Sequence, residues 1–388
     1  MGNRPFDVLL FGSTGFTGSL VAEYFATNVD LKKIKWAIAG RNPSKLEAVK
    51  QKLVSINPVC KDAGVLIADS SDYDSLLKAV SQAQLVVTTV GPFALYGEPL
   101  VKACVEAGTH YCDITGEPEF VKSILKKYDA EAKAKGIYIL NCCGFDSIPA
   151  DAGAFFTAMQ LPFNEQKTIR GYVSTKGSFS GGTYASAINA MAEIGKSPSS
   201  KSGNDNGKKP ARKIRQSIEF DRYLQRWVLP MPVIDPWMVM RTAQYRPEIF
   251  GKDFAYAQFL TLKSFTQVVS LLGMIGVVVL GAKIGPVKKL LLNYRKSGEG
   301  PDKETRDKSY FRLTFTGESD TKKVITRVSG GDPGYTETSK MLSETALLLL
   351  QHAGKLPLNG GVLTPAGALG NLLIEKLQEK GIHFEIIE

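Results

Sequence analysis

The stretch Phe6–Gly18, FDVLLFGSTGFTG, decides the fold of this chain. Phe6–Phe11 is a short apolar run rich in strand-forming residues, and Ser19–Thr27 has the pattern of a helix. The turn between them spaces three glycines as GxxGxxG, which lets the backbone approach a pyrophosphate held by the free N–H groups of a helix N-terminus. The predicted cofactor contacts in this turn are Gly12, Ser13, Thr14, Gly15, Phe16, Thr17 and Gly18.

The same alternation of strand and helix patterns continues through residues 1–150. Further strands are predicted at Ile34–Ala39, Val65–Ala68, Leu85–Val90, His110–Ile114 and Ile137–Asn141. Further helices are predicted at Pro43–Ser55, Asp72–Ser81, Glu98–Ala107 and Glu117–Lys135. Continuous apolar strands between amphipathic helices are typical of a parallel sheet that is covered on both faces. We therefore expect an α/β, Rossmann-type doubly wound nucleotide-binding domain over residues 1–150.

The residues that follow the predicted strands indicate which nucleotide binds. Arg41 stands where an NAD site usually presents an acidic residue to the ribose 2′-hydroxyl, and its fork-shaped cation suits a 2′-phosphate. NADP(H) is therefore expected rather than NAD(H), although Arg41 as a plain surface charge stays open. Asp69 ends the third strand, where it could face the adenine. Val90, Gly91 and Pro92 end the fourth strand and could line the nicotinamide side.

The proton-transferring residue is left open by the sequence, since no Tyr-x-x-x-Lys pair occurs at the place expected for a short-chain reductase. Tyr96, in the loop GPFALYGEP, and Glu117 are the candidates for an acid or a substrate-orienting group. Tyr111, Asp113 and Asp146 are further titratable residues nearby, and the two aspartates suit turns and caps. Each candidate could equally cap a helix or brace a turn.

Metal and disulfide chemistry are not expected. The chain has 388 residues with five cysteines, an odd number without a CxxC pair, and three histidines. Cys142 and Cys143 are interpreted as small core residues at a strand end, with a reactive thiol as the less favoured alternative. The N-terminus carries no signal peptide or amphipathic presequence pattern, so an intracellular protein in a reducing compartment is expected.

A second domain of the α+β class is expected over residues 151–330. Thr168–Thr175 alternates as a strand, Thr183–Ile194 has a helical pattern, and two further runs are interpreted as an antiparallel pair, Tyr310–Thr316 and Lys323–Val328. Between them, Lys196–Arg215 is rich in Ser, Gly, Asn and Lys and predicts a mobile, solvated loop, with a basic binding arm as the alternative. Its basic residues lack interleaved aromatics, so nucleic acid is not an expected partner despite the net charge of +10.

The segment Ser264–Ala282, SFTQVVSLLGMIGVVVLGA, is apolar for 19 residues and carries no charge. This length approaches what is needed to cross a bilayer core. Basic residues follow it directly: Lys283, Lys288, Lys289, Arg295 and Lys296. Since such residues favour anionic headgroups, we expect contact with a membrane or lipid surface through residues 264–296. A buried core helix is the alternative, supported by the polar residues Thr266, Gln267 and Ser270 and by three glycines.

Residues 331–388 contain a predicted helix at Tyr335–His352, another at Pro365–Lys380 and a last strand at His383–Ile387. With these elements, several motifs resemble the saccharopine dehydrogenase-like oxidoreductases. The resemblance rests on RPFDVLLFGSTGFTG (4–18), WAIAGR (36–41), VGPFALYGEPLVKAC (90–104), YCDITGEPEF (111–120), GFDSIPAD (144–151), the apolar segment near 268–280, GDPGY (331–335) and GGVLTPAGALG (360–370).

The resemblance implies a Rossmann domain, an α+β domain, and C-terminal helices of 331–388 that pack back on the Rossmann domain. It also implies association with lipid droplets or membranes and, in some relatives, with mitochondria. Bacterial relatives resemble trans-acting enoyl reductases of glycolipid synthesis. True saccharopine dehydrogenases bind a dicarboxylic adduct, which calls for anchored arginines that we do not find here. If the C-terminal residues pack back, the apolar segment attaches from one side of a membrane.

Three functions follow as hypotheses. The first is an NADP(H)-dependent oxidoreductase that transfers hydride to a lipid-like or apolar substrate at a membrane or lipid-droplet surface. The second is a non-catalytic, membrane-associated nucleotide-binding protein, which the missing acid/base pair would suit. The third is a soluble amino-acid dehydrogenase of the saccharopine type, which the segment 264–282 argues against. A homodimer is left open.

Overall fold

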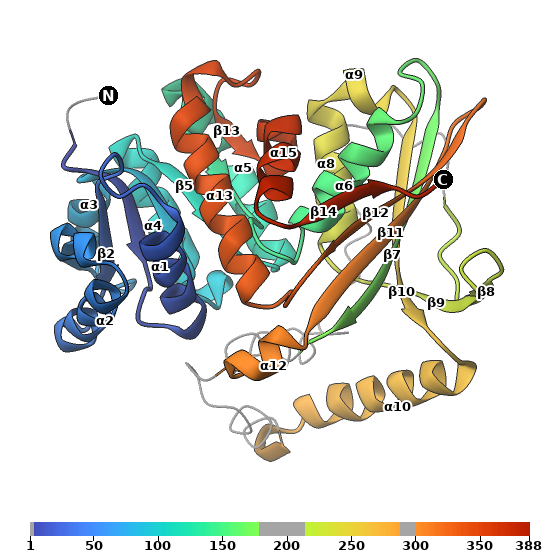
Figure 1. The fold of residues 1–388 in the computed structure, drawn as a ribbon, viewed down its shortest axis with the longest axis horizontal. Helices are drawn as coiled ribbons and strands as arrows, with labels where there is room; N and C mark the ends of the chain where they lie inside the picture. The colour runs from blue at the N-terminus through green and yellow to red at the C-terminus, as the bar shows by residue number, and fades with distance from the viewer. Residues whose placement is uncertain (1–3, 178–213, 288–299) are drawn as a thin grey trace.

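A computed structural model describes residues 4–177, 214–287 and 300–388 of the chain. Two seven-stranded sheets lie side by side, with helices on the faces of the first and between the two (Figure 1). The first sheet is formed mainly by the N-terminal part of the chain and the second by the middle and the end. The predicted Rossmann-type sheet with a second α+β unit is therefore confirmed.

The first sheet is parallel throughout and has the order β13-β6-β5-β4-β1-β2-β3. Its strands are β1 (Phe6–Phe11), β2 (Trp36–Gly40), β3 (Gly64–Ile67), β4 (Ala83–Thr88), β5 (His110–Asp113), β6 (Tyr138–Leu140) and β13 (Gly361–Leu363). The order of the strands reverses between β1 and β4, so their carboxyl ends border the point where this fold binds nucleotides.

Helices cover both faces of this sheet. They are α1 (Phe16–Asn28), α2 (Pro43–Ile56), α3 (Tyr73–Val80), α4 (Phe93–Ala107), α5 (Pro118–Lys135) and the short η1 (Pro58–Asp62). Within β1, Val8 and Leu10 join one buried cluster, whereas Leu9 and Phe11 join the other. Because both faces of the strand are buried, its sequence is apolar without alternation.

The predicted start of the helix Glu98–Ala107 is wrong, because this helix, α4, begins at Phe93. The sequence GPFALYGEP looked like a loop because it contains Gly97 and Pro99. In the structure Gly97 packs against the ring of Phe120, where a side chain would collide with it. Tyr96 therefore belongs to a helix and not to a glycine-rich loop.

The second sheet has the order β14-β12-β11-β7-β10-β9-β8 and is mixed, with β7 parallel to β10 and the other pairs antiparallel. Its strands are β7 (Lys167–Lys176), β8 (Glu219–Asp221), β9 (Arg226–Pro230), β10 (Phe254–Leu262), β11 (Tyr310–Glu318), β12 (Lys323–Gly330) and β14 (His383–Ile386). The helices beside it are α6 (Ile148–Met159), α8 (Asp235–Tyr245) and α9 (Pro247–Phe250).

The antiparallel pair predicted at 310–328 is confirmed as β11 and β12. By contrast, β8, β9, β10 and α8 were not predicted. The predicted helix Thr183–Ile194 and the basic loop Lys196–Arg215, apart from its last two residues, lie outside the described residues.

The C-terminal part of the chain contributes to both sheets. Helix α13 (Thr336–His352) packs on α1, while β13 extends the first sheet and β14 the second. The remaining elements here are η2 (Ala353–Lys355), α14 (Pro365–Leu369) and α15 (Asn371–Glu379). The single helix predicted at Pro365–Lys380 is wrong, because Gly370 interrupts it with a φ of 56°.

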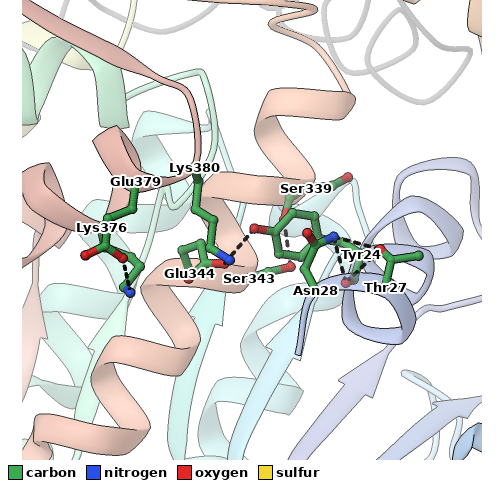
Figure 2. A network of polar contacts seen from close by, with 9 residues as sticks. All are labelled: Tyr24, Thr27, Asn28, Ser339, Ser343, Glu344, Lys376, Glu379 and Lys380. Atoms are coloured by element: carbon green, nitrogen blue, oxygen red, sulfur yellow. Dashed lines mark hydrogen bonds and ion pairs between the residues drawn. The ribbon is translucent and has the colours of Figure 1, made fainter. Parts of the chain in front are cut away.

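A polar network joins these C-terminal helices to the first helix of the chain (Figure 2). The Tyr24 hydroxyl on α1 donates to Oε1 of Glu344 on α13 over 2.5 Å. Lys380, just after α15, places its Nζ 3.5 Å from the same carboxylate oxygen. These contacts hold α13 and the end of α15 against α1, on the first sheet.

Helix α10 (Phe265–Ala282) stands away from both sheets, at the bottom of Figure 1. In the described part of the chain it is the one helix long and apolar enough to cross a membrane. Its buried residues are Val268 and Ala282, whereas Val277 is 72% and Leu280 67% exposed. The alternative of a buried core helix does not fit this exposure. The chain then returns through α12 (Lys303–Asp307) to β11.

Candidate functional site

The turn between β1 and α1 requires glycine at two positions. Gly12 has a φ of +95°, and a Cβ on it would lie 2.5 Å from the Val90 side chain. A Cβ on Gly18 would lie 2.1 Å from the Gly12 carbonyl oxygen. Such distances exclude any side chain. Two predicted cofactor segments, the turn and the end of β4, are thus in direct contact.

The N-terminus of α1 is left open to an anion. No side chain caps it at Gly15, and its first turn has no acidic residue, whereas Asn42 caps α2 and Asp72 caps α3. The Ser13 hydroxyl is buried in the turn without a hydrogen-bond partner. Uncapped N–H groups together with a buried hydroxyl suit phosphate oxygens. The residues present therefore fit the pyrophosphate of a dinucleotide.

Arg41 follows β2 and is exposed. Its guanidinium has no hydrogen bond or ion pair within residues 4–177, 214–287 and 300–388. Asp69, just beyond β3, accepts hydrogen bonds from Ser71 N at 2.9 Å and Ser71 Oγ at 2.8 Å. These bonds, with a smaller contribution from the charge of Arg41, lower the pKa of Asp69. Arg41 thus stands beside an ionised loop carboxylate with its donors unused.

The end of β4 forms the next wall of the site. Val90 is half-buried against the turn Gly12–Gly18, the phosphate turn, and its N–H donates to Thr88 Oγ1 over 3.2 Å. Gly91 is exposed and Pro92 half-buried, directly before α4. The role predicted for these three residues, lining the nicotinamide side, stays a prediction.

The two candidate acids lie in helix-associated positions. Tyr96 is on α4 and 45% exposed. The Glu117 carboxylate accepts hydrogen bonds from the backbone N–H groups of Phe93 at 2.9 Å and Ala94 at 2.8 Å. Both of its oxygens therefore cap the N-terminus of α4 from a distant loop. This structural engagement supports the capping alternative for Glu117.

Asp113 organises the loops that follow β5 and β6. Its buried carboxylate accepts from Thr115 N, Asn141 Nδ2 and Cys142 N at 3.1, 2.7 and 3.0 Å, and from Tyr111 OH at 2.9 Å. Burial raises its pKa to about 6 although these bonds oppose the shift. Cys142, held by one of these bonds, has a φ of 62°. Asp113 is thus fully engaged in holding this edge of the sheet.

Asp146 behaves differently from Asp113. It lies between β6 and α6, where a Cβ on Gly116 would approach its Oδ2 to 3.1 Å. Solvent reaches its side chain, which forms no hydrogen bond within the described residues, yet desolvation by the surrounding protein raises its pKa to about 6. The neighbouring Phe145 packs on Phe311 of the second sheet, with ring centres 5.1 Å apart. The sequence suggested a structural role, but the structure leaves this carboxyl free where the two sheets meet.

A buried polar chain behind Asp146 was not predicted. Asp235 at the start of α8 accepts from Ser147 Oγ at 3.3 Å and from Gln258 Nε2, and Tyr256 OH donates to Gln258 Oε1 at 2.8 Å. Burial, and to a smaller extent the charge of Asp146, raises the pKa of Asp235 to about 8. The only local signal was the dipeptide Asp235-Pro236, which indicates a helix start.

A second carboxyl in the same region is also buried. Asp151 on α6 accepts from Thr242 Oγ1 and from Ala366 N, the latter over 3.0 Å, and burial raises its pKa to about 7. Within the described ranges no three His, Cys, Asp or Glu side chains gather as a metal site. The five cysteines are buried and free.

Comparisons with known proteins agree with this geometry. The family model described as the saccharopine dehydrogenase NADP binding domain matches residues 8–140, which run from β1 to β6. A saccharopine dehydrogenase-like oxidoreductase of Bos taurus is 31% identical over 99% of this chain and 98% of its own length. A Mycobacterium tuberculosis protein with the provisional name trans-acting enoyl reductase is 32% identical over 98% of this chain and 97% of its own length.

One solved structure extends the likeness over the whole chain. The apo saccharopine dehydrogenase (L-Glu forming) of Saccharomyces cerevisiae covers 99% of this chain and 100% of its own, with a TM-score of 0.57 and 12% identity. At this identity the likeness concerns the fold alone. It covers both sheets and not only the nucleotide-binding one.

Proposed function

This chain belongs to the saccharopine dehydrogenase-like oxidoreductases, and from that premise we propose that it is an NADP(H)-dependent oxidoreductase acting on a lipid-like substrate at a membrane or lipid-droplet surface. The observation that carries the proposal is that two features occur together in one chain. An open phosphate turn fits the cofactor, and an exposed apolar helix, α10, fits a lipid surface.

The cofactor is held by two features of the nucleotide-binding sheet. The turn from Gly12 to Gly18 and the start of α1 bind the pyrophosphate, and Arg41 binds the 2′-phosphate that distinguishes NADP from NAD. Bound NADPH supplies a hydride for a C=C, C=N or C=O bond. The protein's own task is then to orient the substrate, exclude water and move a proton.

Asp146 is the group we propose for the proton. A reduced double bond needs a proton at its second atom, and an acid with a pKa near the working pH delivers it well. The Asp146 carboxyl has a pKa raised to about 6, reaches solvent and lies where the second sheet meets the first. Glu117 is less suited because both of its oxygens cap α4.

We expect Asp146→Asn to lower the turnover of NADPH with enoyl, imine or carbonyl lipids about 100-fold or more, because a general acid contributes roughly that much. NADPH affinity, measured by isothermal titration, should stay unchanged. The control is Glu119→Gln, an exposed carboxylate in the first turn of α5. Turnover unaffected by Asp146→Asn would remove Asp146 from the reaction. NADPH binding without any turnover would favour the non-catalytic alternative.

A lipid-like substrate is favoured over an amino acid by α10 and by the provisional enoyl reductase name of the mycobacterial relative. A role in glycolipid synthesis would follow from the same likeness. The yeast saccharopine dehydrogenase shares the fold at 12% identity, which lends its substrate no support here.

The attachment we propose is one-sided. Strands β7 and β11, which pair with each other, come before and after α10 in the chain, and β13 also returns to the first sheet. Both ends of α10 thus lead back to the same body, which a single membrane crossing would divide. Aromatic rings gather at its start, with Trp227 and Phe265 4.8 Å apart, as at many membrane interfaces. Lys263 and Lys283 are exposed at its two ends.

Vesicle flotation tests this attachment. The intact protein should float with vesicles of phosphatidylcholine and phosphatidylserine, whereas the triple variant Val269→Asp, Val277→Asp, Leu280→Asp should stay at the bottom. These three residues are exposed on α10, so each charge would have to enter the interface. The matched control, Leu95→Asp with Phe163→Asp, charges exposed apolar residues elsewhere and should float. Equal flotation of both variants would contradict the role of α10.

The lipid droplet is the location that a one-sided apolar helix suits best, since its surface is a single layer of phospholipid. A mitochondrial membrane is the alternative implied by the resemblance. Fluorescence imaging of the tagged chain in oil-loaded cells separates the two locations. Staining of mitochondria alone would contradict the proposed location at lipid droplets.

A further inference from the structure

A segment that follows α10 in the chain returns to the cofactor turn. Phe16, the first residue of α1, packs edge-on against Tyr335 with ring centres 5.0 Å apart. A Cβ on Gly300 would lie 2.3 Å from the Phe16 ring, so a side chain there would displace the ring. The guanidinium carbon of Arg306 on α12 lies 5.8 Å from the centre of the same ring. A cation from a distant part of the sequence therefore lies over the ring of Phe16, a residue of the turn Gly12–Gly18.

The hydrogen bonds of Arg306 are incomplete. Its Nη1 donates to the Pro301 carbonyl over 2.8 Å, but its Nε is buried without a partner. Neither neighbouring carboxylate forms an ion pair with Arg306: Asp302 caps α12 and only feels the Arg306 charge at a distance, and Glu304 pairs with Lys308 at 2.5 Å. No ion pair to Arg306 is found across the three described ranges. A partly buried guanidinium with unused donors is costly unless an anion completes it.

The phosphate turn lacks a cation of its own. The sequence Gly12–Gly18, GSTGFTG, contains no lysine or arginine, and α1 offers only N–H groups and its dipole. A pyrophosphate carries two negative charges, which these partial charges balance only in part. A pyrophosphate bound at this turn would therefore need a further positive charge, and Arg306 has hydrogen-bond donors free to supply it.

We propose that Arg306 binds the pyrophosphate of NADP(H), alongside the N-terminus of α1. The proposal rests on the proposed cofactor and adds a residue to its site. A planar guanidinium matches phosphate oxygens with two parallel hydrogen bonds. Arg306 contacts what NADPH and NADH share, whereas Arg41 reads the 2′-phosphate that only NADPH has. The two arginines thus divide affinity and selectivity between them.

Isothermal titration of the full chain with NADPH and with NADH tests this division. Arg306→Ala should weaken both by the same factor, about 10- to 100-fold, as expected for a lost charge-assisted pair. Adenosine 2′-monophosphate, which has no pyrophosphate, should bind the variant as it binds the intact protein in an NMR titration. Arg306→Lys should recover part of the affinity, and thermal unfolding confirms that each variant is folded.

Lys303→Ala is the matched control, since it removes an equal charge from the same short helix and should leave both affinities unchanged. If Arg306→Ala bound NADPH and NADH as tightly as Lys303→Ala does, the role of Arg306 would be overturned, while the cofactor proposal would stay intact. Equal weakening of adenosine 2′-monophosphate would overturn it too, because the effect would then be structural. Failure of the intact protein to bind either dinucleotide would instead overturn the proposed function itself, and this inference with it.

Discussion

Replacing Arg41 with alanine is expected to weaken NADPH binding about 10- to 100-fold while changing NADH binding by less than about twofold. Arg41 is exposed at the end of β2 and has no partner within the described residues, so its donors are available to a ligand. A phosphate on the ribose would accept two charge-assisted hydrogen bonds from it, whereas a 2′-hydroxyl gains little from a cation.

The measurement is isothermal titration of both cofactors against the wild type, Arg41→Ala and a control. Lys61→Ala serves as the control because Lys61 is an exposed cation on η1, outside the proposed site. Since NADP carries more charge than NAD, raising the salt concentration should also weaken NADPH binding less in Arg41→Ala than in the wild type. A variant that loses NADH and NADPH equally would show that Arg41 shapes the site rather than reads the 2′-phosphate.

Asp235→Asn is expected to stabilise the protein at pH 8 and to change it least near pH 5. The pKa of Asp235 is raised by burial to about 8, against an ordinary value near 4. Between these values the folded protein holds a proton that the unfolded chain releases, so stability falls as the pH rises. Since one pKa unit corresponds to about 1.4 kcal/mol, the raised pKa of Asp235 lowers the free energy of unfolding at pH 7 by at most on the order of 4 kcal/mol. Asparagine removes that cost and keeps an oxygen for Gln258.

Urea unfolding at several pH values measures this effect. The wild type should lose stability from pH 5 to pH 8, and the slope should be smaller in Asp235→Asn. Part of the slope should persist, because burial also raises the pKa values of Asp113 and Asp151. Asp307→Asn, an exposed carboxylate on α12, should keep the wild-type slope. A uniform loss of stability in Asp235→Asn at every pH would mean that the ionised carboxylate is needed.

The nucleotide-binding sheet could be predicted closely because its signals are local. The apolar runs at β1, β2 and β4 have neighbours within a few residues that form the turns and helices. The start of α4 was missed because its cap, Glu117, lies 24 residues beyond Phe93 in the chain. A helix boundary set by a distant carboxylate leaves no mark in the local pattern, which showed only Gly97 and Pro99.

The second sheet was harder for the same reason. Its strand β7 pairs with β10 and β11, partners that follow long after it in the chain. The short strands β8 and β9 and the helix α8 carry no periodicity that distinguishes them from loops. Their assignment depends on which face they bury, and that depends on the whole sheet.

The glycine turn Gly12–Gly18, the cation at Arg41 and the apolar stretch of α10 could be recognised from the sequence alone, because each is a continuous segment whose residue types suit one kind of ligand. The tertiary structure alone decided which acids are free. It committed Glu117 to a helix end, left Asp146 open and buried Asp235 with a raised pKa. It also brought Arg306 beside Phe16 and placed β10 and β11, the strands before and after α10, in the same sheet. Burial, pKa and long-range contacts depend on atoms hundreds of residues apart, and only the packed chain brings those atoms together.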